Sequence, residues 1–101
     1  MRVVVVTRDL MDGSRFRALG AEVRVARRPD DPELTAADLV VVDLAGRFDL
    51  EALVGLGPPV LAYGSHVDTA ALDAARAAGC VDAVPRSVVV RRVASALDGE
   101  G

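Results

Sequence analysis

The stretch Leu39-Val40-Val41-Val42-Asp43 places four aliphatic residues directly before an acid. A continuous run of β-branched residues is typical of a strand that is covered on both faces, as in a parallel sheet. The same pattern occurs at Val3–Val6 and, after Pro58 and Pro59, at Val60–Tyr63. These three segments predict the buried central strands of a parallel sheet.

Two further segments predict the outer strands of this sheet. Glu22–Val25 alternates polar and apolar residues, which is typical of a half-exposed edge strand. Ala83-Val84 follows a glycine turn and predicts a short fifth strand. Residues 27–35 contain Pro29 and Pro32 and show no periodic pattern, so any helix there is expected to be about one turn long.

Four segments between and after the strands predict helices. They are Met11–Leu19, Asp49–Leu56, Asp68–Ala78 and a last helix that begins at Ser87 and runs to Leu97. Asp68 and Ser87 are expected to cap their helices, because a short side-chain oxygen accepts a hydrogen bond from the first turn. In the last helix, apolar residues at positions 90, 93, 94 and 97 have the spacing of one buried face.

Alternating strands and helices favour a doubly wound α/β fold of the flavodoxin-like kind. Its sheet has five parallel strands in the order 2-1-3-4-5, with helices on both faces. The chain has 101 residues, of which 51% are hydrophobic, so it has room for one domain with a packed core. We therefore expect a single domain over residues 1–101, with a frayed tail at 98–101.

The composition excludes several classes of protein. No apolar run approaches the roughly 20 residues needed to span a bilayer, and the first residues do not have the pattern of a signal peptide. The single cysteine, Cys80, excludes an intramolecular disulfide and is expected to be a small buried hydrophobe. The net charge of −3, without a basic stripe, disfavours binding to nucleic acid. These features favour a cytoplasmic protein that binds neither membranes nor nucleic acid.

The order of the elements resembles that of response-regulator receiver domains, and the resemblance covers nearly the whole chain. The third predicted strand ends in Asp43, where this family places its phosphoacceptor. Pro59–Ser65 resembles the family's proline-led fourth strand, which ends in a small hydroxyl residue. Ala74–Val84 resembles the family's alanine-rich helix, glycine turn and short fifth strand.

The chain departs from the family's pattern where the resemblance implies chemistry. Active receivers hold Mg²⁺ with an acidic pair after the first strand, and here Thr7 and Arg8 occupy the matching positions, with Asp9 one place later. The family's hydroxyl residue falls on Gly64. The chain contains no lysine, so the lysine that pairs with the phosphoryl group in the family is missing, and Arg86 is the nearest cation.

These departures favour a receiver-like domain that has lost its phosphorylation chemistry. Asp43 is then a remnant of the phosphoacceptor, held by Arg8, by Arg86 or by backbone amides. If the Arg8 and Asp43 side chains turn toward each other, they form an ion pair in place of the metal site. The residues expected to line a pocket at this edge of the sheet are Arg8, Asp9, Gly64, Ser65 and Arg86.

The resemblance implies a non-catalytic bacterial signalling or regulatory module that acts by binding another protein. The expected contact surface is Asp68 to Leu97, and a second copy of the chain is one candidate partner. We expect no cofactor and no bound metal, because the first strand is not followed by a G-x-G-x-x-G motif or by an acidic pair. Ser65, His66 and Asp68 lack the strained turn that hydrolases use to present a nucleophile, so no enzyme activity is expected.

The sequence is compatible with two alternative functions. The first is a small-ligand binding domain, because open α/β sheets bind ligands at the carboxyl ends of their strands. The second is a conventional receiver domain in which Asp43 accepts a phosphoryl group.

Overall fold

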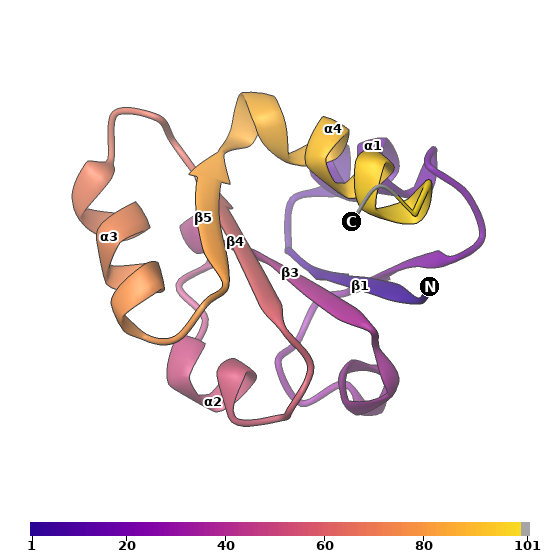
Figure 1. The fold of residues 1–101 in the computed structure, drawn as a ribbon, viewed down its shortest axis with the longest axis horizontal. Helices are drawn as coiled ribbons and strands as arrows, with labels where there is room; N and C mark the ends of the chain where they lie inside the picture. Colours follow the sequence, from indigo (N-terminus) through magenta and orange to yellow (C-terminus); the bar gives the residue numbers. More distant parts are fainter. Residues whose placement is uncertain (100–101) are drawn as a thin grey trace.

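Residues 1–99 of a computed structural model form a five-stranded parallel sheet with helices on both faces (Figure 1). The strands are β1 (Val3–Val6), β2 (Val23–Ala26), β3 (Leu39–Asp43), β4 (Val60–Gly64) and β5 (Asp82–Pro85). They are arranged in the order β2-β1-β3-β4-β5. The predicted fold class and strand order are therefore confirmed.

The helices separate into two layers, one on each face of the sheet (Figure 1). The helical segments are α1 (Leu10–Arg17), η1 (Pro32–Ala36), η2 (Leu44–Gly46), α2 (Leu50–Val54), α3 (Thr69–Ala77) and α4 (Arg86–Leu97). Side chains of α1 and α4, led by Phe16 and Val93, pack on one face together with Val5 and Val41. Those of η1, α2 and α3 pack on the other face. Val5 and Val41 are fully buried, as expected for central strands.

The register of the strands brings their polar carboxyl ends together. Val5 pairs with Val41, and Asp43 at the end of β3 lies opposite Tyr63 on β4. Gly64 in turn lies opposite Pro85, the last residue of β5. Because the strands are parallel, Asp43, Tyr63 and the start of α4 meet at one edge of the sheet.

An aspartate caps the start of most of the helices, because its short side chain can accept a hydrogen bond from an amide of the first turn. Asp68 caps α3 by accepting a hydrogen bond from the Ala71 amide at 3.1 Å, as predicted. The predicted Ser87 cap is wrong, because α4 already begins at Arg86 and Pro85 occupies the capping position. Proline fixes its own φ near the value a helix start requires, so the chain turns into the helix directly after β5.

The connection between β2 and β3 is nearly free of helix, as its two prolines predict. It contains only the short 3₁₀ helix η1, which begins after Asp31 and buries Leu34 completely. At the other end of the chain, α4 stops at Leu97, and residues 100–101 of the expected frayed tail lie outside the described residues. Within residues 1–99 no helix is both long and apolar enough to cross a membrane.

Candidate functional site

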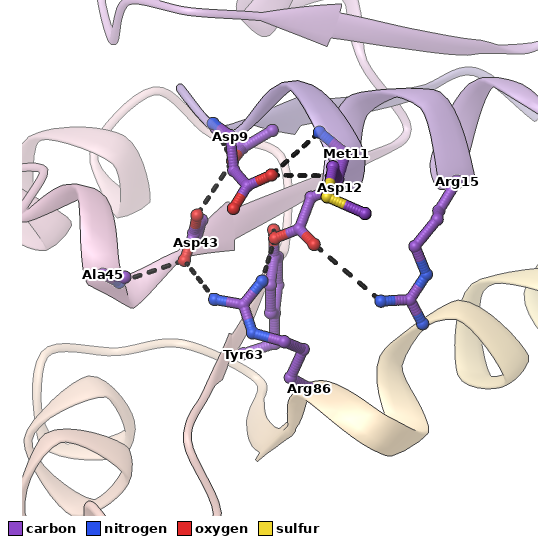
Figure 2. A network of polar contacts seen from close by, with 9 residues as sticks. Asp9, Met11, Asp12, Arg15, Asp43, Ala45, Tyr63 and Arg86 are labelled. Atoms are coloured by element: carbon purple, nitrogen blue, oxygen red, sulfur yellow. Dashed lines mark hydrogen bonds and ion pairs between the residues drawn. The ribbon is translucent and has the colours of Figure 1, made fainter.

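Asp43 is buried at the carboxyl end of β3, and protein groups hold both of its carboxylate oxygens (Figure 2). The Thr7 hydroxyl donates to Oδ2 at 2.8 Å. The Ala45 amide donates to Oδ1 at 3.0 Å, and the Arg86 Nη2 group lies 3.4 Å from the same oxygen. The side chain is therefore fixed in place by three donors from three different segments.

Asp12 forms the second buried carboxylate of the site. It lies on α1 and is only 4% exposed, and its Oδ2 accepts hydrogen bonds from the Tyr63 hydroxyl at 2.9 Å and from Arg86 Nη1. An acid in the first turn of a helix is ordinarily explained as a partner of the helix dipole, so its place in the sequence does not by itself single out Asp12. A signal was available, because Asp12 precedes Phe16 by four residues and the two therefore share the buried face of α1.

Arg86 joins the two carboxylates. Its guanidinium bridges Asp12 and Asp43 and lies 5.2 Å from the centre of the Tyr63 ring. Burial lowers the pKa of this guanidinium, but the hydrogen bond and the charge of Asp12, with further help from Asp43, more than offset that effect. The net result is a raised pKa, so Arg86 remains charged.

Tyr63 lies beneath this bridge and is fully buried. Its ring packs beside Phe16, with 5.7 Å between the ring centres, while its hydroxyl reaches Asp12. Burial is the main cause that raises the pKa of the Tyr63 phenol far above its usual range, and the charges of Asp43 and Asp12 act in the same direction. The phenol therefore remains a hydrogen-bond donor at all ordinary pH values.

The expected pair between Arg8 and Asp43 does not form. Arg8 Nη1 donates to the Gly46 carbonyl at 2.7 Å, and its guanidinium lies 4.3 Å from the centre of the Phe48 ring. The reason is the alternation of side chains along an extended strand: Thr7 follows Val5 on the face of Asp43, whereas Arg8 points to the opposite face. Arg8 therefore anchors the loop after β3 instead of the carboxylate.

The other expected pocket residues are divided between two roles. The Asp9 carboxylate accepts hydrogen bonds from the Met11 and Asp12 amides, so it caps α1. Gly64 and Ser65 line a hollow of about 330 Å³ beside Arg86. The remaining lining residues of this hollow are Leu44, Ala45, Arg47, Asp68 and Ala71. Of the five expected residues, Arg86 is the one that forms an ion pair with the Asp43 carboxylate.

The residues of this edge do not fit a divalent cation. Mg²⁺ requires several oxygen ligands in near-octahedral array, and such sites usually take one or two carboxylates that are free to bind it. Here the carboxylates of Asp9, Asp12 and Asp43 are each engaged by amide, hydroxyl or guanidinium donors. Among residues 1–99, no group of three or more acidic, histidine or cysteine side chains is arranged to hold a metal ion.

No protein-family model matches the chain, and no curated protein matches it in sequence. Solved structures do match. A pilus assembly-related protein from Burkholderia pseudomallei superimposes with a TM-score of 0.70 at 20% identity, over 98% of this chain and 87% of that one. A response regulator protein from Burkholderia multivorans gives a TM-score of 0.67 at 24% identity, over 93% and 92% of the two chains.

A third similar structure is NtrX from Brucella abortus, solved in complex with ADP. It superimposes with a TM-score of 0.71 at 23% identity over 99% of this chain, which corresponds to 29% of the NtrX chain. At these identities the likeness shows the fold. The chain therefore has a receiver-like fold, as its resemblance to receiver domains predicted.

Removing Arg86 should leave two buried carboxylates without their shared partner. Arg86→Ala is expected to lower the free energy of unfolding by about 2–4 kcal/mol, somewhat less than for a fully buried pair because the side chain is partly exposed. A double-mutant cycle of Arg86→Ala with Asp12→Ala, measured by urea denaturation, is expected to give a coupling energy of about 1–3 kcal/mol. The same cycle between Arg8 and Asp43 is the control, with an expected coupling near zero. The reverse ranking of the two couplings would contradict the network.

The Tyr63 phenol provides a pH test, because it is the only tyrosine in the chain. Its pKa in the folded protein lies above the ordinary value of 10.0. The stabilising contribution of this group is therefore complete below about pH 10 and declines as the pH rises above it, since only the unfolded chain then releases the proton. Titration followed by phenolate absorbance should show no ionisation until the protein unfolds, whereas the chain in urea should titrate near the ordinary value. A phenolate that forms near pH 10 in the folded state would refute the buried contact.

Proposed function

We propose that this chain is a non-catalytic, receiver-like regulatory module that acts by binding another protein and is not phosphorylated in the usual way. One observation carries the claim that the chain is not phosphorylated in the usual way. The Arg86 guanidinium bridges Asp12 and Asp43 at the place where a receiver needs an accessible carboxylate and a metal ion. A positive charge held by two carboxylates imitates electrostatically what Mg²⁺ supplies. The bridge then holds the domain in a single conformation.

Phosphoryl transfer to Asp43 would have to displace its existing partners. The attacking oxygen must be free, and the phosphoryl oxygens need a cation beside them. Both oxygens of Asp43 already accept hydrogen bonds, and the two positions that would supply metal ligands hold the Thr7 hydroxyl and Arg8, which points to the opposite face of the sheet. This arrangement supports a carboxylate with a structural role.

The surface formed by α3, β5 and α4 is the candidate docking surface, and it carries a row of alternating charges. Arg76 Nη1 lies 3.1 Å from Asp73 Oδ1, and Arg76 Nε lies 3.6 Å from Asp82 Oδ1. Arg92 Nη1 lies 2.9 Å from the second carboxylate oxygen of Asp82, Oδ2. Asp73 is 77% exposed, Arg76 and Arg92 are about half exposed, and Asp82 is partly exposed. Exposed ion pairs contribute little to stability, so this row is available to set the choice and orientation of a partner.

The outer edge of β5 is closed to an added strand. Arg76 Nη2 donates to the Ala83 carbonyl at 2.6 Å, and the Asp82 carboxylate accepts from the Ala83 amide at 2.8 Å. An exposed sheet edge offers its backbone groups to any extended chain, and proteins prevent this pairing with charged side chains such as these. A partner at this surface would therefore recognise charged side chains and not the backbone of β5.

The absence of phosphoryl transfer can be tested directly. Incubation of the protein with acetyl phosphate and Mg²⁺ should leave its mass unchanged, and beryllofluoride with Mg²⁺ should leave its amide NMR spectrum unchanged. Asp43→Asn is the matched control, which should behave like the native chain in both experiments. A labile phosphoryl adduct on Asp43 of the native chain that is lost in this variant would refute the proposal and establish a conventional receiver.

The docking surface can be tested by charge reversal. A partner captured from the native host is identified by mass spectrometry, purified and titrated calorimetrically against the protein. Arg76→Glu combined with Arg92→Glu is expected to weaken this binding at least about tenfold, because it reverses two charges of the row. Arg24→Glu is the control, since Arg24 is an equally exposed member of an ion pair, with Glu33, on the opposite edge strand β2. Equal weakening by both variants would contradict the proposed surface.

A further inference from the structure

A second hollow lies beside the site, between α1, the loop after β4 and the start of α4. It has a volume of about 460 Å³ and is lined by Arg15, Ser65, His66, Pro85, Arg86 and Ser87. We infer that this hollow binds a phosphate group, as free phosphate or as the phosphate of a small organic monoester. The inference does not depend on the proposed protein partner.

The charge of the lining is the first argument. Its titratable side chains are Arg15, Arg86 and His66, and none of the lining residues is acidic. A hollow of the same volume beside β2 is lined by two arginines, Arg27 and Arg28, and by two aspartates. The lining of the hollow next to α1 therefore carries a net positive charge, whereas the charges that line the depression of equal size beside β2 balance, and a net positive lining favours an anion.

The two arginines approach the hollow from opposite sides. Figure 2 shows Arg15 extending from α1 toward α4, and Arg86 extending from the start of α4 toward α1, with Asp12 between their guanidinium groups. Arg15 Nη1 lies 3.9 Å from Asp12 Oδ1, which is too far for a hydrogen bond. Half of the Arg15 side chain and 34% of the Arg86 side chain are exposed. Asp12 thus positions both groups and leaves N–H donors free for an incoming ligand.

Polar donors complete the remaining sides of the hollow. Ser87 contributes a hydroxyl from the first turn of α4, and that turn carries no acidic side chain to oppose an anion. Ser65 and the exposed His66 contribute from the loop after β4. Guanidinium groups form paired hydrogen bonds with phosphate oxygens, and these are among the strongest polar contacts in proteins.

The arrangement favours a phosphate group over a carboxylate. A carboxylate is planar and is satisfied by one guanidinium in a bidentate pair. The donors of this hollow come from α1, from the loop after β4 and from α4, which suits a tetrahedral anion with oxygens that point in several directions. The volume also leaves room for a small organic group attached to the phosphate.

The test is an NMR titration of the ¹⁵N-labelled protein at constant ionic strength. Inorganic phosphate, glycerol 3-phosphate and acetate are added separately, with chloride as the balancing anion. We expect saturable shifts of the Ser65, His66, Arg86 and Ser87 amides with the phosphates. Saturation by inorganic phosphate alone assigns a free-phosphate site, and tighter binding of glycerol 3-phosphate assigns a phosphate-monoester site. Shifts that do not saturate, or acetate that binds as tightly, would overturn the inference.

Two variants localise the binding. Arg15→Gln is expected to raise the Kd for phosphate about tenfold, because it removes one charge-assisted pair of hydrogen bonds. Arg17→Gln is the matched control, since Arg17 is exposed on the same helix but is not part of the lining. The amide spectra of both variants without ligand show whether the fold is kept. Equal weakening by the two substitutions would mean that phosphate responds to net charge only, and the site would be rejected.

Discussion

The bridge from one guanidinium to two buried carboxylates is the interaction on which the polar edge of this domain depends. Arg86 comes from the start of α4, Asp12 from α1 and Asp43 from the end of β3. These segments are far apart in the sequence and are joined by this contact and by the apolar packing below it. The bridge therefore fixes the position of α1 and α4 relative to the central strand.

The bridge is stable because its desolvation cost is shared among many donors. A buried carboxylate costs several kcal/mol unless its oxygens are paired. The Thr7 hydroxyl and the Ala45 amide complete the shell of Asp43, and the Tyr63 hydroxyl completes that of Asp12. Within residues 1–99 every buried side-chain nitrogen or oxygen has a hydrogen-bond partner. The polar edge therefore acts as part of the core as well as part of a surface.

Much of the fold could be predicted from the sequence because its signals are local. Val3–Val6 and Leu39–Val42 have no polar residue that a one-sided strand would require, so their burial on both faces follows from composition alone. The predicted cap of α4 lies two residues too late because two local signals compete there. Ser87 is a good cap by its chemistry, but Pro85 had already set the backbone for a helix start.

The candidate site was harder to predict because it depends on directions across the sheet. Arg8 and Arg86 both follow a strand, and composition does not distinguish them as partners of Asp43. The alternation of side chains along a strand does distinguish them. Thr7 points to the same face of the sheet as Val5 and Asp43, whereas Arg8 points to the other face, like Val6. Asp12 was overlooked because an acid in a first helical turn has an ordinary explanation as a partner of the helix dipole. Its true role depends on the Tyr63 hydroxyl, which is 51 residues away in the sequence.

The most direct test of this account is the rotation of the Arg86 guanidinium about its Nε–Cζ bond, measured by ¹⁵N NMR of the arginine side chains. A guanidinium held by carboxylates on two sides should rotate slowly and give two separate Nη signals at low temperature, unlike the exposed guanidinium of Arg91. Slow rotation at Arg86 that becomes fast in the Asp12→Asn variant is the predicted result. Fast rotation at Arg86 in the native chain, equal to that of Arg91, would contradict the claim that this residue bridges the two buried carboxylates.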